Sequence, residues 1–223
     1  MSPRTTKQYE EIRNNKFELI KNTALKLFAK KGYHATTISA IAKDAGISKG
    51  LMYNYFDSKD ELVIALFNDY IKILTGLLNP NNDHEITNEE MSDFFSLFVK
   101  SLSENNDYWK LFFQLSVQQE VISIMFSKIR NNKVFEENLK LLSSYFFERF
   151  ENPEQEMMLF NSVIKGFCLV YVYTPESFTN DSLNQFIDRL KSMFIREKLK
   201  SGLSTETSHS SFKINDSLKK SFI

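Results

Sequence analysis

The sequence contains few of the residues that bend or cross-link a chain. Among 223 residues there are six Gly, four Pro and a single Cys. One Cys excludes an intramolecular disulfide and a zinc site built from several cysteines. All-β folds need turn residues about every 8–12 positions, so the scarcity of Gly and Pro favours long helices. We therefore expect an all-α protein with about nine helices.

Long apolar runs are lacking too. The longest, Phe167–Tyr173, is far shorter than the roughly 20 apolar residues that a membrane helix needs. The first 30 residues are rich in charge and contain no apolar segment typical of a signal peptide. We therefore expect a cytoplasmic protein with no membrane partner.

A net charge is also absent, but only in the total. The chain has 28 Lys+Arg and 28 Asp+Glu; residues 1–60 hold 11 and 6 of these, which leaves 17 and 22 for residues 61–223. The first region therefore carries +5 (11 − 6) and the second −5 (17 − 22). A local positive excess suits a phosphate backbone, whereas an acidic remainder discourages non-specific wrapping on DNA.

Residues 33–62 combine two short helical segments with a tight turn. Thr37 and Ser48 each precede one of these segments, and both residue types are favoured as helix N-caps. Between the segments, Gly46 can adopt the left-handed backbone conformation that a sharp turn requires. This is the helix-turn-helix pattern, in which the second helix enters the major groove of DNA.

The outward side of the second helix is rich in groups that bind nucleic acid. Tyr and Lys donate to phosphate oxygens, and Lys and Asn also pair with base edges. The helix N-termini direct backbone N–H groups toward phosphates, and Gly50 lets the backbone approach the groove floor. His34, in the preceding loop, is as compatible with plain surface as with phosphate contact. The candidate DNA-binding residues are Thr37, Ser48, Lys49, Gly50, Leu51, Tyr53, Asn54, Tyr55 and Lys59.

Residues 17–62 resemble the DNA-binding domain of the TetR family of bacterial transcriptional regulators. The resemblance covers about the first quarter of the chain, and Tyr55 departs from it because His is common at that position. It implies an all-α homodimer with an N-terminal three-helix helix-turn-helix domain and a C-terminal helical bundle for ligand binding and dimerisation. It also implies a double-stranded DNA operator, from which a small-molecule effector releases the protein. The matching residues are Thr37-Ile38, Ile41-Ala42, Ala45-Gly46-Ile47-Ser48-Lys49-Gly50, Met52-Tyr53, Tyr55-Phe56, Lys59 and Leu62.

Hydrophobic periodicity predicts the remaining helices. Residues 1–15 are polar and predicted to be frayed at the start, and from Phe17 the apolar residues fall on one face of a helix that ends at Lys31. Capping boxes at Ser58–Glu61 and Thr87–Glu90 predict two later helix starts. Further helices are expected at residues 59–78, in two pieces at 108–128, and at 133–150, 153–173 and 180–200, with an interruption at Asn131-Asn132.

Three regions follow from this order of elements. Residues 1–60 are expected to form the helix-turn-helix DNA-binding domain. Residues 61–200 are expected to form the ligand-binding and dimerisation domain. Residues 201–223 form a Ser-rich C-terminal tail.

The bundle is unusually rich in aromatic residues, and aromatic side chains line many small-molecule pockets. The same residues at helical spacing also suit a plain hydrophobic core. We expect the effector to be a small, largely apolar molecule, and we expect no cofactor and no metal. The candidate ligand-binding residues are Trp109, Phe112, Phe113, Phe126, Phe146, Phe160, Phe167 and Tyr171.

The two predicted helices at 153–173 and 180–200 are candidates for a dimer interface, because two from each subunit make a four-helix bundle. A monomer would expose many of their apolar residues. Alternatively, these helices simply close the core of the monomer. The candidate interface residues are Val163, Gly166, Val170, Phe186, Leu190, Met193 and Phe194.

The sequence thus predicts a ligand-responsive DNA-binding repressor. One alternative is a transcriptional activator of the same fold, because the sequence of a regulator does not encode the position of its operator. Another is a helical protein that binds a small molecule without specific DNA binding. An enzyme is disfavoured, because the three His residues at 34, 84 and 209 are scattered and no nucleophile–base spacing is present.

Overall fold

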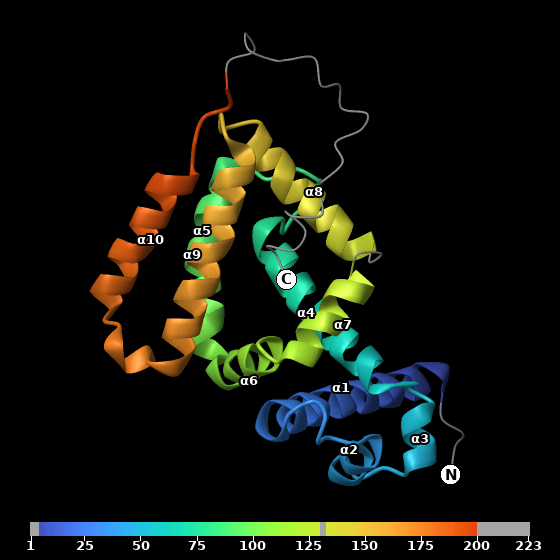
Figure 1. Ribbon diagram of the computed structural model, residues 1–223. Helices are drawn as coiled ribbons and strands as arrows, with labels where there is room; N and C mark the ends of the chain where they lie inside the picture. The colour runs from blue at the N-terminus through green and yellow to red at the C-terminus, as the bar shows by residue number, and fades with distance from the viewer. Residues whose placement is uncertain (1–4, 130–132, 200–223) are drawn as a thin grey trace. The chain divides into compact units, whose positions relative to one another are not determined.

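The computed structural model describes residues 5–129 and 133–199 (Figure 1). Within these residues the chain forms ten α-helices, one short 3₁₀ turn and no strand, which confirms the predicted all-α fold. The chain divides into two compact units. The first unit comprises the residues up to Asp69 together with Leu111–Lys128, and the second comprises Tyr70–Lys110 and the residues from Ile129 onward.

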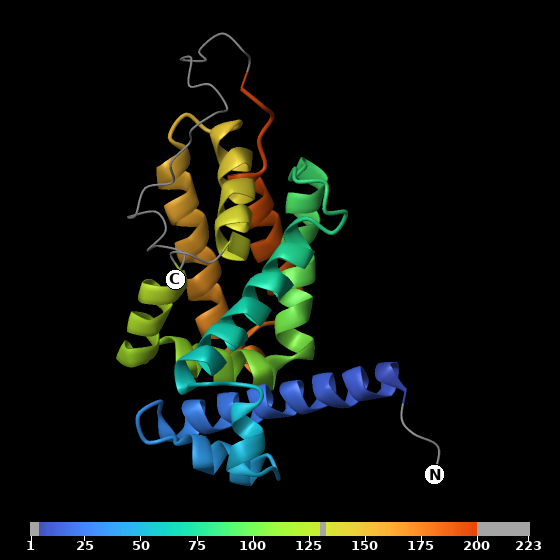
Figure 2. The same ribbon diagram turned by 90° about the vertical axis from the view of Figure 1, so that its right-hand side faces the viewer.

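Helix α1 (Thr6–Lys31) begins eleven residues before Phe17, the first residue of the predicted apolar face. A capping box starts the helix: the Thr5 N–H donates to the Gln8 side chain at 2.9 Å, and the Gln8 N–H donates to the Thr5 hydroxyl at 3.3 Å. Residues 5–15 are all exposed, so the segment has no buried face and its helicity leaves no hydrophobic period in the sequence. Figure 2 shows the N-terminal end of α1 extending beyond α3.

Helices α2 (Ile38–Asp44) and α3 (Lys49–Tyr53) form the predicted helix-turn-helix. The hydroxyls of Thr37 and Ser48 each accept a first-turn N–H at 3.1 Å, which confirms both as N-caps. The turn between the helices contains Gly46 with φ +66°, the left-handed conformation that its position requires.

Helix α4 (Lys59–Leu78) begins and ends where the sequence predicts. Ser58 caps it by accepting the Glu61 N–H at 3.2 Å. The Glu61 carboxylate accepts the Asp57 N–H at 2.8 Å, one residue earlier than in an ideal capping box. The first part of α4 belongs to the first unit and the rest to the second.

A buried ion pair joins α1 to the part of α4 that lies in the first unit. The Lys21 side chain is only 3% exposed, and its ammonium donates to the carboxylates of Asp69 and Glu18. Burial disfavours the charged ammonium, but the hydrogen bonds and charges of the two carboxylates outweigh it and raise the pKa of Lys21. Lys21 is therefore a structural cation.

The second unit contains α5 (Asn88–Glu104), α8 (Lys133–Phe147), α9 (Pro153–Tyr173) and α10 (Asn180–Phe194). Two further helices, α6 (Asn106–Ser116) and α7 (Gln119–Ile129), connect α5 to α8, and each contributes residues to both units. The predicted capping box at Thr87 and Glu90 is confirmed, with bonds of 2.9 and 3.1 Å between each backbone N–H and the other side chain. The predicted interruption at Asn131-Asn132 and the tail at 201–223 lie outside the described residues.

A cluster of phenylalanine rings forms the core of this unit where α5 packs against α9 and α10, and α8 against α9. The ring centroid of Phe160 lies 5.2 Å from that of Phe194 and 5.5 Å from that of Phe146. Such edge-on and offset contacts are favoured by aromatic quadrupoles. The cluster, named here the Phe cluster, comprises Phe94, Phe95, Phe98, Phe146, Phe150, Phe160 and Phe194.

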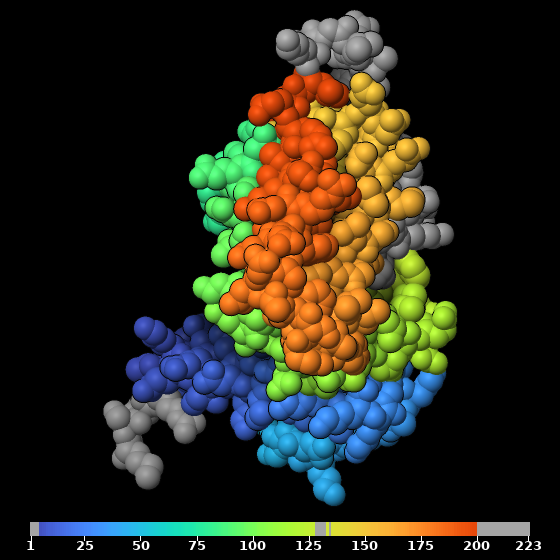
Figure 3. Space-filling view, turned by 90° about the vertical axis from the view of Figure 1, so that its left-hand side faces the viewer, coloured from blue at the N-terminus to red at the C-terminus, as the bar shows by residue number. Residues whose placement is uncertain are grey.

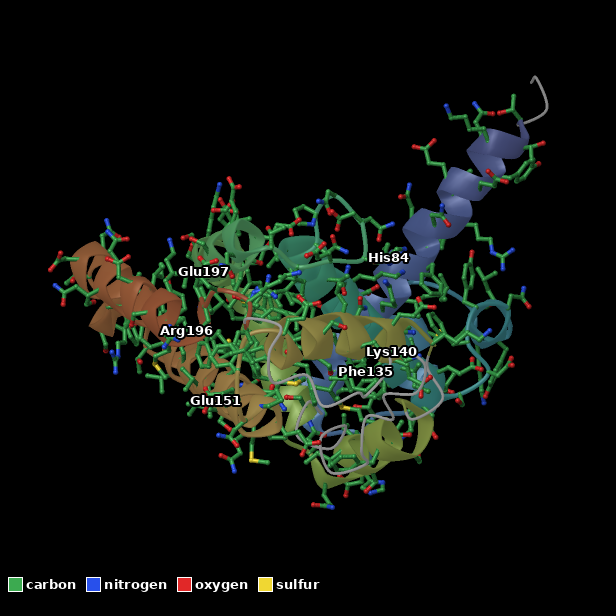
Figure 4. The ribbon with its side chains drawn as sticks, turned by 90° about the horizontal axis from the view of Figure 1, so that it is seen from above. His84, Phe135, Lys140, Glu151, Arg196 and Glu197 are labelled. Atoms are coloured by element: carbon green, nitrogen blue, oxygen red, sulfur yellow. The ribbon has the colours of Figure 1, made fainter. Side chains whose placement is uncertain are left out.

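Helix α10 ends at Phe194, so the expectation that it runs to residue 200 is wrong. The following backbone is extended and is held by distant partners. The Leu199 N–H donates to the Glu148 carbonyl at 2.8 Å, and the Lys198 ammonium lies 3.0 and 2.8 Å from the carboxylates of Glu85 and Glu148. Figure 4 views the second unit from this end, where His84, Glu151, Arg196 and Glu197 are labelled.

Among the described residues, α9 is the one helix that is long and apolar enough to cross a membrane by length and composition. In its most apolar window, 44% is buried inside the protein. Figure 1 shows α9 running beside α10, to which the 3₁₀ turn (Pro175–Ser177) connects it. Its composition therefore combines a core-facing side with an exposed apolar side.

Candidate nucleic-acid interface

An open groove lies where α2, α3 and the start of α4 meet in the first unit. Four of the predicted DNA-binding residues line it: Thr37, Lys49, Tyr53 and Lys59. Thr36, Ile38 and Ser39 also line the groove and were missed by the sequence analysis, although they flank the predicted cap Thr37. The lining therefore combines two ammonium groups with hydroxyl groups, which are donors to phosphate oxygens.

The rest of the predicted set lies on or beside α3. Ser48, Gly50 and Asn54 are exposed, as are Lys49 and Tyr53, whose side chain is 45% exposed. Leu51 and Tyr55 are half-buried, so they present only part of their surface. Met52, which is fully buried, and Phe56, which stacks on Phe17 at 4.8 Å, anchor the opposite side of this segment. The sequence placed α3 with the correct side outward.

The two lysines of the groove differ in how firmly their side chains are held. Lys49 is exposed, whereas the Lys59 ammonium donates to the Tyr33 carbonyl at 2.8 Å and lies 4.3 Å from the centre of its ring. Lys59 is therefore held at the groove edge by a hydrogen bond and a cation–π contact.

Tyr33 itself is fixed by its hydroxyl, which donates to Asp60. Burial and this hydrogen bond raise the pKa of Tyr33 above its usual range, so the hydroxyl stays protonated. His34 beside it lies 3.0 Å from Glu120, and its side chain is 76% exposed. The loop between α1 and α2 is thus tied both to the start of α4 and to the start of α7.

The fold and the groove together define a helix-turn-helix protein. Residues 20–66 match the family described as "Bacterial regulatory proteins, tetR family". This match confirms, for the N-terminal domain, the resemblance to the TetR family of bacterial regulators that the sequence indicated.

Two curated relatives each match less than half of the chain. YuxN of Bacillus subtilis, an HTH-type transcriptional regulator, is 37% identical over 94 residues, which cover 42% of this chain and 32% of YuxN. IcaR of Staphylococcus epidermidis, the negative transcriptional regulator of the biofilm operon icaADBC, is 30% identical over 102 residues, which cover 46% of this chain and 54% of IcaR. The chain thus spans about a third and about half of the lengths of these relatives.

One solved structure matches over most of the chain. NalD, the secondary repressor of the MexAB-OprM multidrug efflux pump in Pseudomonas aeruginosa, aligns with a TM-score of 0.61 at 20% identity. The alignment covers 84% of this chain and 99% of NalD. At this identity the likeness shows a shared fold.

The structure does not gather the eight predicted ligand-binding residues within one unit. Phe112, Phe113 and Phe126 belong to the first unit. In the second unit, Trp109 is buried against Tyr70, with ring centroids 5.9 Å apart. Phe146 and Phe160 lie in the Phe cluster, whereas Phe167 and Tyr171 pack with Phe178 and Phe186 in a second aromatic group.

The predicted dimer residues divide between core and surface. Leu190 and Phe194 are 2% and 0% exposed, so the prediction that they form an exposed interface is corrected: both pack inside the second unit. Phe186, Met193 and Val163 are half-buried, and Phe186 stacks on Phe167 at 4.4 Å between ring centroids. The periodicity of α10 shows its apolar side but not whether that side meets its own chain or another.

The exposed apolar surface of this pair of helices lies on α9. Figure 3 shows α10 and part of α9 side by side at the surface of the second unit. Val170 is 53% exposed, and Gly166 is exposed one helical turn before it. The sequence analysis missed the other apolar members of this exposed surface. With Val170 and Gly166 they form what is named here the α9 face: Met158, Leu159, Gly166, Leu169, Val170 and Tyr173.

The inner side of α9 carries two unusual titratable groups. Burial lowers the pKa of Lys165 to about 8. Burial also raises the pKa of the Cys168 thiol, which keeps it protonated and unreactive. Within the described residues, no group of three or more His, Cys, Asp and Glu side chains is placed to hold a metal ion.

Proposed function

We propose that this protein is a dimeric, cytoplasmic transcriptional repressor that binds double-stranded DNA and is released by a small-molecule effector. The observation that carries the proposal is the groove of the first unit, where Lys49, Tyr53 and Lys59 surround the start of a helix-turn-helix. The match of residues 20–66 to the family of bacterial regulatory proteins supports DNA binding and regulation. The printed descriptions of IcaR and NalD as negative regulator and repressor favour repression over activation.

In the proposed complex, α3 enters the major groove. Lys49 and Tyr53 reach phosphate oxygens and base edges, and Lys59 contacts the flanking backbone from its fixed position. A dimer presents two copies of α3, which read half-sites about 34–36 Å apart or a multiple of that distance. An effector acts by favouring a state with a different spacing of the two α3 helices, because it must bind that state better to shift the equilibrium.

DNA binding is tested on a duplex selected from random DNA with the full-length protein. Fluorescence anisotropy at several salt concentrations gives both the affinity and the slope of log K against log salt. Lys49→Ala is expected to reduce the magnitude of the slope by about 0.9 per lost phosphate contact. Tyr53→Phe, which removes only a hydroxyl, is expected to weaken binding to all sequences. Lys140→Ala, an exposed lysine of α8, is the matched control and should bind like the wild type.

Failure to select any duplex would favour the second candidate, a helical protein that binds a small molecule without specific DNA binding. The aromatic content of the second unit supports this candidate independently of the groove. Native mass spectrometry of the purified protein then separates the two. A bound apolar molecule without DNA binding indicates a carrier, whereas a selected duplex indicates a regulator.

The proposed homodimer rests on the α9 face. An exposed apolar surface on a soluble unit marks an interaction site, and Gly166 within it permits close approach of a second helix. Val170→Asp introduces a charge at the centre of this face and is expected to shift the protein to monomers in sedimentation velocity. Leu97→Asp, on α5 and 41% exposed, is the control and should leave the dimer intact. A wild-type protein that sediments as a monomer would refute this part of the proposal.

A further inference from the structure

The side chain of Gln118 bridges two distant points of the DNA-binding unit. Gln118 lies between α6 and α7, and its amide bonds to residues 85 and 90 positions earlier in the chain. Its Oε1 accepts the Tyr33 N–H at 2.8 Å, and its Nε2 donates to the Phe28 carbonyl at 2.9 Å. A single half-buried amide therefore bonds to the last turn of α1 and to the residue after Gly32, while its Nε2 also donates to the nearby Gln114 carbonyl at 3.2 Å.

These two partners fix the bend that leads from α1 into α2. The Phe28 carbonyl belongs to the last turn of α1, where it also accepts the Gly32 N–H at 3.0 Å. Gly32 has φ +87°, so the chain reverses direction there, and the Tyr33 N–H follows directly. Orphan groups at a helix end need partners, and Gln118 supplies one for each side of the bend.

The residue that Gln118 holds is also the residue that places Lys59. The carbonyl and ring of Tyr33 bind the Lys59 ammonium, and its hydroxyl binds Asp60 in the first turn of α4. Lys59 lines the groove with Thr37 and Lys49. A short relay thus runs from Gln118 through Tyr33 to a cation at the edge of the groove.

We propose that Gln118 is a positioning residue for DNA binding. It touches no DNA itself but holds Tyr33, and through it Lys59, in the geometry that meets a phosphate. The inference rests on the proposed function, because it assigns a role within the same groove. It adds a residue that lies outside the matched family region of residues 20–66 and that no local sequence signal indicates.

The test uses Gln118→Met in the full-length protein, which keeps the length of the side chain but removes its hydrogen bonds to Tyr33 and Phe28, together with a local one to the Gln114 carbonyl. Gln119→Met, at the exposed neighbouring position, is the matched control. On DNA the variant must order this bend without the two bonds from Gln118, and a cost of about 1.4 kcal/mol, within the range of two net hydrogen bonds, corresponds to roughly tenfold weaker binding of the selected duplex. The magnitude of the salt slope is expected to fall by up to about 0.9, the value of one phosphate contact. The control should change neither quantity, and circular dichroism checks that both variants are folded.

A double-mutant cycle shows whether the effect passes through Lys59. Gln118→Met is expected to cost little further affinity in a Lys59→Ala background, but its full tenfold in a Lys49→Ala background, because Lys49 is outside the relay. Wild-type affinity of the Gln118 variant would overturn the inference. So would weaker binding with an unchanged salt slope and full additivity with Lys59→Ala, which is the pattern of general destabilisation. If the wild type itself selects no duplex, the proposed function fails first, and the two failures are distinguishable.

Discussion

Replacing Phe194 by Ala tests whether the end of α10 belongs to the core or to an interface. Phe194 is fully buried, and its ring centroid lies 5.2 Å from that of Phe160, 6.2 Å from Phe146 and 6.3 Å from Phe95. A buried Phe→Ala change removes this packing and leaves a cavity, at a cost of about 3–5 kcal/mol. Domain stabilities are about 5–15 kcal/mol, so the loss is a large fraction of the total.

The assay is urea unfolding followed by circular dichroism at several protein concentrations, combined with sedimentation velocity of the native protein. Phe194→Ala is expected to lower the free energy of unfolding by about 3–5 kcal/mol. Under native conditions, the dimer dissociation constant should stay the same. Met193→Ala, at the half-buried neighbouring position, is the control and should cost about 1 kcal/mol.

A particular result would refute the core assignment. If Phe194→Ala left the unfolding of the monomer unchanged and raised the dimer dissociation constant, Phe194 would have to contact a second subunit. Val170→Asp gives the opposite pattern under our reasoning, because that side chain is 53% exposed and touches the core little. The two variants together therefore separate packing within the chain from packing between chains.

Three further predictions follow from single groups. Gly46→Ala places a Cβ at φ +66°, and we expect it to cost about 1–2 kcal/mol in thermal unfolding and to weaken duplex binding. Asp69→Asn leaves buried Lys21 with Glu18 as its only carboxylate partner of the original two; we expect it to destabilise the protein by about 1–3 kcal/mol, and Lys21→Met in that background to restore most of the loss. Lys165 has a folded pKa of about 8, below its usual 10.5, so the unfolded chain binds more protons between these values; relative to Lys165→Met, the free energy of unfolding should rise from about pH 8 to pH 10.5, and a flat difference would contradict the burial.

Local signals in the sequence predicted much of the fold. Thr37, Ser48 and Thr87 are confirmed as helix caps because each side chain bonds to a backbone group three residues away. Gly46 is also confirmed at its turn, because the positive φ that favours glycine depends on a single residue. Interactions between residues only a few positions apart can be predicted from a short stretch of sequence. They were sufficient to define the helix-turn-helix and to orient α3.

Distant partners account for the errors. The extended segment after Phe194 pairs through Lys198 with Glu85 and Glu148, neither of which is near it in sequence. The first turns of α1 are helical without a buried face, so they lack the period on which the prediction relied. For α10, periodicity gave the apolar side correctly, but the choice between core and interface depends on the packing of α5 and α9.

The charge excess of residues 1–60 likewise does not tell which cations line the groove. This part of the sequence contains eleven Lys and Arg residues and six Asp and Glu residues. In the structure, Lys21 is used internally by two carboxylates, and of the cations that the structure describes between residues 5 and 60, only Lys49 and Lys59 line the groove. Lys59 is oriented by Tyr33, while exposed Lys49 pays the entropic cost of ordering when it binds. The positive excess therefore describes long-range attraction to DNA. The affinity of the groove depends instead on the few cations that line it and on how firmly each of them is held.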